Sequence, residues 1–143
     1  VDLFSQEDGA RFTVNLFKND LFVDFDAKLF QRIFSNLVLN AMQSGGIKDI
    51  VKIVVNVRKE DDKVLVSVCD DGLGIAPEFV SKIFTPNFTT KNTGSGIGLS
   101  VAQRGIQQGG GKVWFETRYG KGSTFFILLP LVDGAPSSLD PDF

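Results

Sequence analysis

Hydrophobic and polar positions alternate with a period of two in several stretches of this chain and recur at helical spacing in others. Alternation predicts strands over residues 11–17, 21–25, 51–58, 64–69, 112–117 and 124–129. Helical spacing predicts a long helix over 27–44, a short helix over 77–83 and a third over 96–108. The segment from Thr85 to Ser95 shows neither period and is predicted to be a loop.

Turn and cap residues separate these elements. Asp26 is a good N-cap for the long helix, whose apolar stripe contains Phe30, Phe34, Leu37 and Ala41 and is widened by Leu29 and Ile33. Pro77 is suited to the first turn of the short helix. Glycines at 45–46 and 109–111 are expected to end the other two helices.

The order of the elements predicts the fold class. Strands joined by short turns are antiparallel, and helices long enough to cover a sheet lie between the hairpins. We therefore expect an α/β (α+β) two-layer sandwich, whose mixed, mostly antiparallel sheet is covered on one face by helices. Residues 1–132 are expected to form this domain. Residues 133–143 are expected to be a disordered tail or a linker.

Composition excludes several classes of function. The net charge of −2 gives no basic footprint for nucleic acid, and no apolar run is long enough to span a bilayer. A single cysteine, Cys69, excludes an internal disulfide and a cysteine-based zinc site. The absence of histidine excludes a Ser-His-Asp triad, histidine-ligated metals and a histidine phosphoacceptor within these residues.

Two asparagines on the long helix are candidates for metal chemistry. Asn36 and Asn40 are four residues apart, so they share one face of the helix. An amide oxygen is a hard neutral ligand that suits magnesium, which takes its other oxygens from phosphates and water. The alternative is that both side chains only form local hydrogen bonds.

Asp70 is a candidate for recognition of a base. It follows Val64, Val66 and Val68 in strict alternation, so its carboxylate is expected to face the layer between sheet and helices. A buried carboxylate needs hydrogen-bond donors, and the exocyclic amine of adenine would supply one. The alternative is that backbone amides of the following turn satisfy Asp70. Asp71 is expected to be an exposed turn residue.

Two glycine clusters flank the loop. Gly72 and Gly74 follow Asp70, while Gly94, Gly96 and Gly98 precede the third helix. Glycines let backbone amides approach phosphate oxygens, and a helix N-terminus adds favourable charge. The alternative is two ordinary turns, since neither cluster completes a P-loop or a dinucleotide-binding motif.

The loop between the clusters contains one further candidate and two anchors. Lys91 is either a phosphate ligand or a solvated lysine, and Phe84 and Phe88 read as hydrophobic anchors.

Taken in order, these motifs resemble the ATP-binding catalytic domain of sensor histidine kinases, in the GHKL superfamily with its Bergerat-type fold. Residues 36–41 resemble its asparagine box, 70–75 its first glycine box, 84–91 its phenylalanine box and 94–100 its second glycine box. The phenylalanine box is most similar to that of nitrogen-regulation-type kinases. The resemblance covers roughly residues 20–131 and includes the final hairpin.

The resemblance implies that the domain binds ATP and Mg²⁺. Asn40 would coordinate the metal with Asn36 beside it, Asp70 would accept from the adenine amine, and Ser123 would keep a hydroxyl near the base. No residue of the chain would act as nucleophile or base. The implied ATP-binding residues are Asn36, Asn40, Asp70, Gly72, Gly74, Ile75, Phe84, Thr89, Thr90, Lys91, Gly94, Gly96, Ile97, Gly98, Leu99 and Ser123.

The resemblance also implies partners. About 20 residues precede the matched region, too few for the helical hairpin that carries the phosphoacceptor histidine. We therefore expect a histidine-bearing dimerisation domain, in the same parent chain or in trans, and a response regulator receiver domain downstream. The isolated domain would be a monomer in the cytoplasm, without nucleic-acid or membrane contact, and the parent a homodimer with or without a membrane anchor. A second departure is Gly109, where many members have histidine.

Two other functions remain as alternatives. Hydrolases resembling gyrase and mismatch-repair ATPases place a glutamate four residues before the magnesium asparagine, where this chain has Asn36. An amide cannot act as a general base, which argues against efficient hydrolysis. A non-catalytic nucleotide-binding module is the other alternative. Transfer to a protein serine, as in anti-sigma-factor kinases, is disfavoured by the sequence of residues 86–91.

Overall fold

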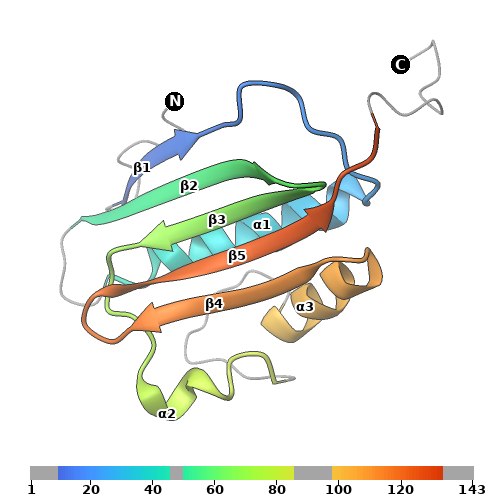
Figure 1. The fold of residues 1–143 in the computed structure, drawn as a ribbon. Helices are drawn as coiled ribbons and strands as arrows, with labels where there is room; N and C mark the ends of the chain where they lie inside the picture. The colour runs from blue at the N-terminus through green and yellow to red at the C-terminus, as the bar shows by residue number, and fades with distance from the viewer. Residues whose placement is uncertain (1–9, 46–49, 86–97, 134–143) are drawn as a thin grey trace.

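The computed structural model describes residues 10–45, 50–85 and 98–133 of the 143-residue chain. Its five-stranded sheet has the order β1-β2-β3-β5-β4, with β1 and β2 parallel and every other neighbouring pair antiparallel (Figure 1). The elements are β1 (Ala10–Asn15), α1 (Ala27–Met42), β2 (Val51–Glu60), β3 (Lys63–Asp70), α2 (Pro77–Val80), α3 (Leu99–Gln108), β4 (Lys112–Arg118) and β5 (Gly122–Pro130).

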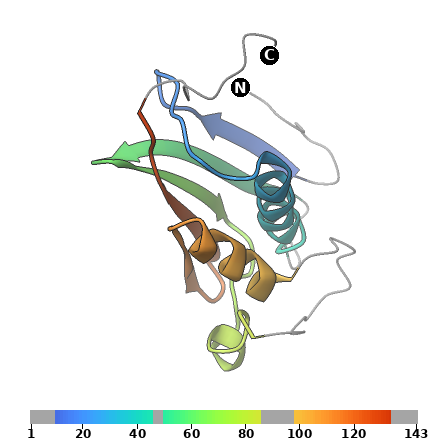
Figure 2. The ribbon, with the colours of Figure 1, turned by 90° about the vertical axis from the view of Figure 1, so that its right-hand side faces the viewer.

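The two longer helices cover one face of the sheet. Figure 2 shows α1 and α3 on the same side of the strands, as expected for a two-layer sandwich with a mixed, mostly antiparallel sheet. The expected fold class is therefore confirmed.

Among the described residues, none of the helices could span a bilayer.

The core lies between the helices and the inner face of the sheet. Strand register places Val55, Val68, Phe125 and Phe115 in one row across β2, β3, β5 and β4. The fully buried side chains of α1 and α3 that meet this face are Ile33, Leu37, Ala41, Ala102 and Ile106. These residues follow the helical spacing that predicted both helices.

Helix α1 begins where its capping residue predicts. The Asp26 carboxylate accepts hydrogen bonds from the amides of Lys28, at 2.9 Å, and Leu29, at 3.1 Å. The helix ends at Met42, two residues before the expected end, and α2 and α3 are likewise shorter than their predicted ranges. Gly105 of α3 lets the two helices approach, because an added Cβ would lie 3.3 Å from Leu29 Cδ2.

The predicted strand over residues 21–25 is wrong. Leu21, Val23 and Phe25 do pack against the core, which explains their alternation, but the segment forms no ladder with another strand. The backbone bond that ties it to the rest of the domain runs from the Val132 amide to the Phe22 carbonyl, at 2.8 Å. The strand-like alternation of residues 21–25 thus reflects only their partial burial. Because this segment is not a strand, β1 forms no hairpin with it and pairs in parallel with β2.

The other two predicted hairpins, β2–β3 and β4–β5, are present. Asp61 has φ 56° in the β2–β3 turn, a left-handed conformation that aspartate tolerates. The Lys63 ammonium group hydrogen-bonds the neighbouring Asp62 carboxylate at 3.1 Å and lowers the pKa of that carboxyl. Because both side chains are exposed, this ion pair adds little to stability.

Candidate functional site

A row of polar side chains crosses the inner face of the sheet at the end where β3 finishes and β5 begins. This end of the two strands lies on the left in Figure 1. Register pairs Asp70 with Ser123, and Ser123 with Thr117, so the three lie side by side on β3, β5 and β4. Asp70 and Ser123 are each only 6% exposed. The expected inward direction of Asp70 is therefore confirmed, and we call these three residues the polar row.

The Asp70 carboxylate is tied to the loop that follows it. The Gly72 amide donates to Asp70 Oδ1 at 2.9 Å. A backbone amide of the following turn is therefore one of its partners, as the alternative reading held. The bond fixes the carboxylate at the start of residues 70–75, which we call the glycine loop.

The glycine loop is fastened to two other parts of the domain. The Leu73 amide donates to the Ser44 carbonyl at 2.7 Å, just beyond the end of α1. The Gly120 amide donates to the Leu73 carbonyl at 2.5 Å, and the Ile75 amide donates to Thr117 Oγ1 at 2.9 Å. The loop is thus held in one conformation between α1 and the β4–β5 hairpin.

The two glycines of this loop are required by its packing. A Cβ added to Gly72 would lie 2.2 Å from Ser44 Oγ and 2.3 Å from Ser44 O, distances that no real side chain tolerates. Gly74 has φ +80°, and its added Cβ would lie 2.6 Å from the Arg118 carbonyl oxygen. Both positions therefore exclude a side chain before any ligand is considered.

The asparagine pair lies on the α1 face that leads to this loop. Asn36 and Asn40 are four residues apart in the second half of α1, so they share one side of the helix. Because the Ser44 carbonyl, just beyond the end of α1, accepts from the Leu73 amide, the C-terminal end of the helix meets the glycine loop. Asn36 is buried at 3% exposure and Asn40 is half-buried. The structure thus brings the asparagine face and the polar row to one end of the domain.

Phe84 acts as a hydrophobic anchor. Its ring packs on Phe115 with centroids 5.8 Å apart, and Phe115 stacks on Phe125 at 5.5 Å. Phe115 and Phe125 form the row next to Ser123 and Thr117, so Phe84 covers the inner face beside the polar row. This agrees with the anchoring role that the sequence indicated.

Helix α3 begins without a capping side chain. Gly98 is its N-cap, and its first turn contains no acidic residue. A Cβ added to Gly98 would meet no described atom within 4 Å, so packing does not require glycine there. Leu99 is half-buried against the core. An uncapped helix N-terminus is a favourable environment for an anion.

Six of the predicted site residues lie outside the described part of the chain. These are Thr89, Thr90, Lys91, Gly94, Gly96 and Ile97.

Sequence reasoning missed two residues. Thr117 completes the polar row, and its place could be found only from the register of β4 against β5. Asp71 is half-buried instead of being an exposed turn residue: its Oδ1 accepts from the Lys52 amide at 2.8 Å, and its own amide donates to the Lys52 carbonyl at 3.2 Å. Asp71 therefore extends the β2–β3 pairing beyond the last residue of β3.

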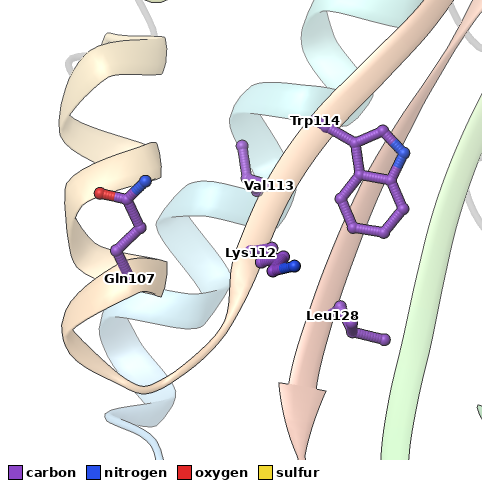
Figure 3. A pocket seen from close by; sticks show the side chains of 5 residues that line it. All are labelled: Gln107, Lys112, Val113, Trp114 and Leu128. Carbon is purple, nitrogen blue, oxygen red and sulfur yellow. The ribbon is translucent and has the colours of Figure 1, made fainter.

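A shallow hollow elsewhere contains none of these residues. It lies between the end of α3 and β4, and Figure 3 shows the side chains that line it, which are Gln107, Lys112, Val113, Trp114 and Leu128. The Trp114 ring stacks on Phe126 at 5.0 Å, on the face of the sheet opposite the polar row. Within the described ranges, no three His, Cys, Asp or Glu side chains come together as a metal site.

Comparison with protein families gives one match that covers most of the chain. The family described as histidine kinase-, DNA gyrase B- and HSP90-like ATPase matches residues 25–133. The sensor histidine kinase ZraS of Salmonella typhimurium is 37% identical over 131 residues, which are 92% of this chain and 28% of ZraS. The sensor histidine kinase WalK of Bacillus subtilis is 30% identical over 132 residues, covering 88% of this chain and 22% of WalK. The chain thus spans less than a third of either relative.

Solved structures of histidine kinases are also similar to this chain. The nucleotide-free catalytic domain of histidine kinase ThkA is 34% identical with a TM-score of 0.75, and the match covers 87% of this chain and 81% of that domain. A structure of ThkA in complex with the response regulator protein TrrA matches with a TM-score of 0.72 at 32% identity, over 89% of this chain and 36% of the ThkA chain.

Proposed function

Because this chain belongs to the family of histidine kinase-, DNA gyrase B- and HSP90-like ATPases, and within it to the catalytic domains of sensor histidine kinases, we propose that it binds Mg-ATP and presents the γ-phosphate to a histidine on a separate dimerisation domain. The observation that carries this proposal is the polar row under a rigid glycine loop. Three polar side chains at one end of an otherwise apolar sheet face form a preorganised site for a flat heterocycle with hydrogen-bonding edges.

In the base-binding part of the site, the Asp70 carboxylate would accept from the exocyclic amine of adenine. Asp70 is buried and already oriented by the Gly72 amide, so little reorganisation is needed on binding. Gly72, Gly74 and Ile75 would border the base with their backbone. Ser123 lies opposite Asp70 in the register, and Phe84 packs on Phe115 in the neighbouring row. The residues present therefore fit an adenine ring.

In the phosphate-binding part, Asn40 would hold Mg²⁺, with Asn36 one turn away on the same face. The start of α3 at Gly98 and Leu99, where the N-cap residue has no side chain to cap the helix, would present backbone amides to the phosphates. We also assign Thr89, Thr90, Lys91, Gly94, Gly96 and Ile97 to this part from the motif alone. When bound, the metal would neutralise charge on the phosphates, and the chain contributes mainly positioning.

The second candidate function, efficient ATP hydrolysis, is disfavoured by Asn36. It occupies the helix position from which a carboxylate would activate water, and an amide has no basic oxygen of suitable pKa. Slow hydrolysis suits a kinase, because it conserves ATP until an acceptor arrives.

The acceptor must lie outside the printed sequence, which contains no histidine. We propose a histidine-bearing dimerisation domain as the direct partner, in a homodimeric parent protein, and a response regulator receiver domain as the next acceptor. The complex of the similar ThkA with a response regulator supports the second step. Use of ATP favours a cytoplasmic location.

Calorimetric titration tests the proposal. The chain should bind ATP more tightly with Mg²⁺ than without it, and it should release phosphate only slowly. Asn40→Ala should abolish most of the gain from Mg²⁺, because the metal loses its protein oxygen, and should leave metal-free binding nearly unchanged.

Ser35→Ala is the matched control, since Ser35 is exposed on α1. This variant should behave like the parent chain. An equal gain from Mg²⁺ in Asn40→Ala would remove Asn40 from the metal site, and no binding of ATP by the parent chain would overturn the proposed function.

A further inference from the structure

Strand β4 forms one edge of the sheet. The described sheet has the order β1-β2-β3-β5-β4, so β4 has a neighbouring strand on one side only (Figure 1). Within the described residues, no backbone hydrogen bond joins the other side of β4 to another segment. An edge of this kind presents amide and carbonyl groups to which a further strand can bond.

The free edge of β4 offers these backbone groups at alternate residues. The Arg118 carbonyl accepts from the Lys121 amide at 2.8 Å in the β4–β5 turn, so the polar backbone groups of Arg118 point to β5. Alternate residues of an antiparallel strand bond to opposite neighbours. The amides and carbonyls of Val113 and Phe115 therefore point to the free edge.

The outward side chains of β4 are symmetric in charge about its tryptophan. Lys112, Trp114 and Glu116 alternate along the strand and lie on the face of the sheet opposite the polar row. Lys112 and Glu116 are exposed, and Trp114 is half-buried. The Trp114 ring stacks on Phe126 at 5.0 Å, so its position is already fixed in a single chain.

A second copy of β4 fits this edge in an antiparallel arrangement, with a two-fold axis at Trp114. Val113 would then exchange backbone hydrogen bonds with Phe115 of the second copy. Lys112 would lie opposite Glu116 of the second copy, and the two tryptophans opposite each other. These are the non-hydrogen-bonded pairs of such a ladder, in which side chains approach most closely. Opposite charges and paired aromatic rings are favourable at such positions.

We propose that residues 112–116 of the free β4 edge form a self-association surface, whose partner is the same strand of a second copy of this chain. Charge complementarity supports this choice of partner, because the two-fold axis makes each Lys112–Glu116 contact twice. The other edge strand, β1, lacks this symmetry: its outward residues Arg11, Thr13 and Asn15 include no acidic side chain. The inference does not depend on nucleotide binding.

Five paired residues form a small interface, so the association is weak. The isolated domain therefore remains mostly monomeric in dilute solution, as the sequence predicts. In the proposed homodimeric parent, two domains would be held at an effective concentration of about millimolar, which favours the pairing. The antiparallel arrangement places the two polar rows at opposite ends of the joined strands.

Chemical cross-linking tests the predicted contact in the unmodified chain. A carbodiimide joins an amine to a carboxylate that touches it, without a spacer. At high protein concentration we expect an amide link between Lys112 and Glu116, identified by mass spectrometry in a mixture of isotope-labelled and unlabelled chains. Within one strand these two residues are about 13 Å apart, too far for direct coupling, so the link must join two chains.

Two charge variants test the symmetry. Glu116→Lys places lysine opposite lysine, and Lys112→Glu places glutamate opposite glutamate. Each variant alone should associate at least about tenfold more weakly than the parent chain in sedimentation equilibrium, because both attractive pairs become repulsive. An equimolar mixture of the two variants restores a lysine–glutamate pair on both sides and should regain the parent association. Arg11→Glu is the control, since it makes the same change of charge on the other edge strand.

Two results would overturn the inference. One is a parent chain that stays monomeric up to about millimolar concentration and forms no Lys112–Glu116 link between chains. The other is an association that both charge variants retain, because a different surface would then carry it. Loss in each variant with recovery in the mixture would support the β4 edge as the interface.

Discussion

At the scale of single residues, Asp70 occupies a place where a carboxylate is costly unless donors surround it. It shares the inner face of β3 with Val68 and is 6% exposed, and the Gly72 amide donates to it. A buried carboxyl oxygen that a backbone amide already orients is a strong acceptor for an amine. In the proposed function, Asp70 would select a base by its hydrogen-bonding edge.

Asp70→Asn tests this role. The substitution preserves shape but replaces one acceptor oxygen with a donating NH₂ group, which faces the adenine amine unfavourably and suits the oxygen of guanine. We expect ATP affinity to fall by about 10- to 100-fold, the value of one charged hydrogen bond, with a smaller loss for GTP. Calorimetric titration with both nucleotides measures it.

Glu116→Gln is the matched control, because Glu116 is exposed on the face of β4 opposite the polar row. It should retain ATP affinity. Unchanged affinities of Asp70→Asn for both nucleotides would remove Asp70 from the site.

The sequence predicted the direction of those side chains whose direction is determined by the local strand or helix geometry. Asp70 faces inward because strand alternation leaves no other choice, and Asn36 and Asn40 share a face because of helix geometry. Thr117 and Asp71 could not be predicted in this way. Their partners, Ser123 and Lys52, become neighbours only through the register of one strand against another.

At the scale of elements, α1 connects the core to the site. The buried side chains of α1 pack it against the sheet, and Asp26 caps its N-terminus. Just beyond its C-terminus, the Ser44 carbonyl accepts from the glycine loop. The sequence predicted this helix because the capping residue and the apolar stripe both indicate a helix that begins after Asp26. The predicted strand over residues 21–25 was wrong, because alternating burial there is not accompanied by pairing with another strand.

Asp26→Ala tests the contribution of the cap. Two amides of the first turn lose their acceptor, so the free energy of unfolding should fall by about 0.5–2 kcal/mol. Asp24→Ala removes an exposed carboxylate two residues earlier and should change stability much less. Urea unfolding followed by circular dichroism gives both values, and equal values for the two variants would exclude Asp26 as a significant cap.

At the scale of the whole molecule, one layer of helices covers the sheet. The polar row lies at one end of the inner face of that sheet. The order of hairpins and helices was enough to predict this architecture. The parallel pairing of β1 with β2 was not predictable, because no short turn connects them and long-range contacts decide it. The proposed nucleotide site lies at this end of the inner face, where the glycine loop is fastened to α1 and to the β4–β5 hairpin.

We propose that this domain transfers phosphate to a histidine on another domain. To test this transfer, the chain and radiolabelled ATP are mixed with the histidine-bearing helical domain of the same parent protein, and the labelled products are then treated with acid. We expect acid-labile label on the helical domain only. The rate should be reduced, because a tether between the domains would supply an effective concentration of about millimolar. Rapid phosphate release by the chain alone, unaffected by the helical domain, would contradict this proposal.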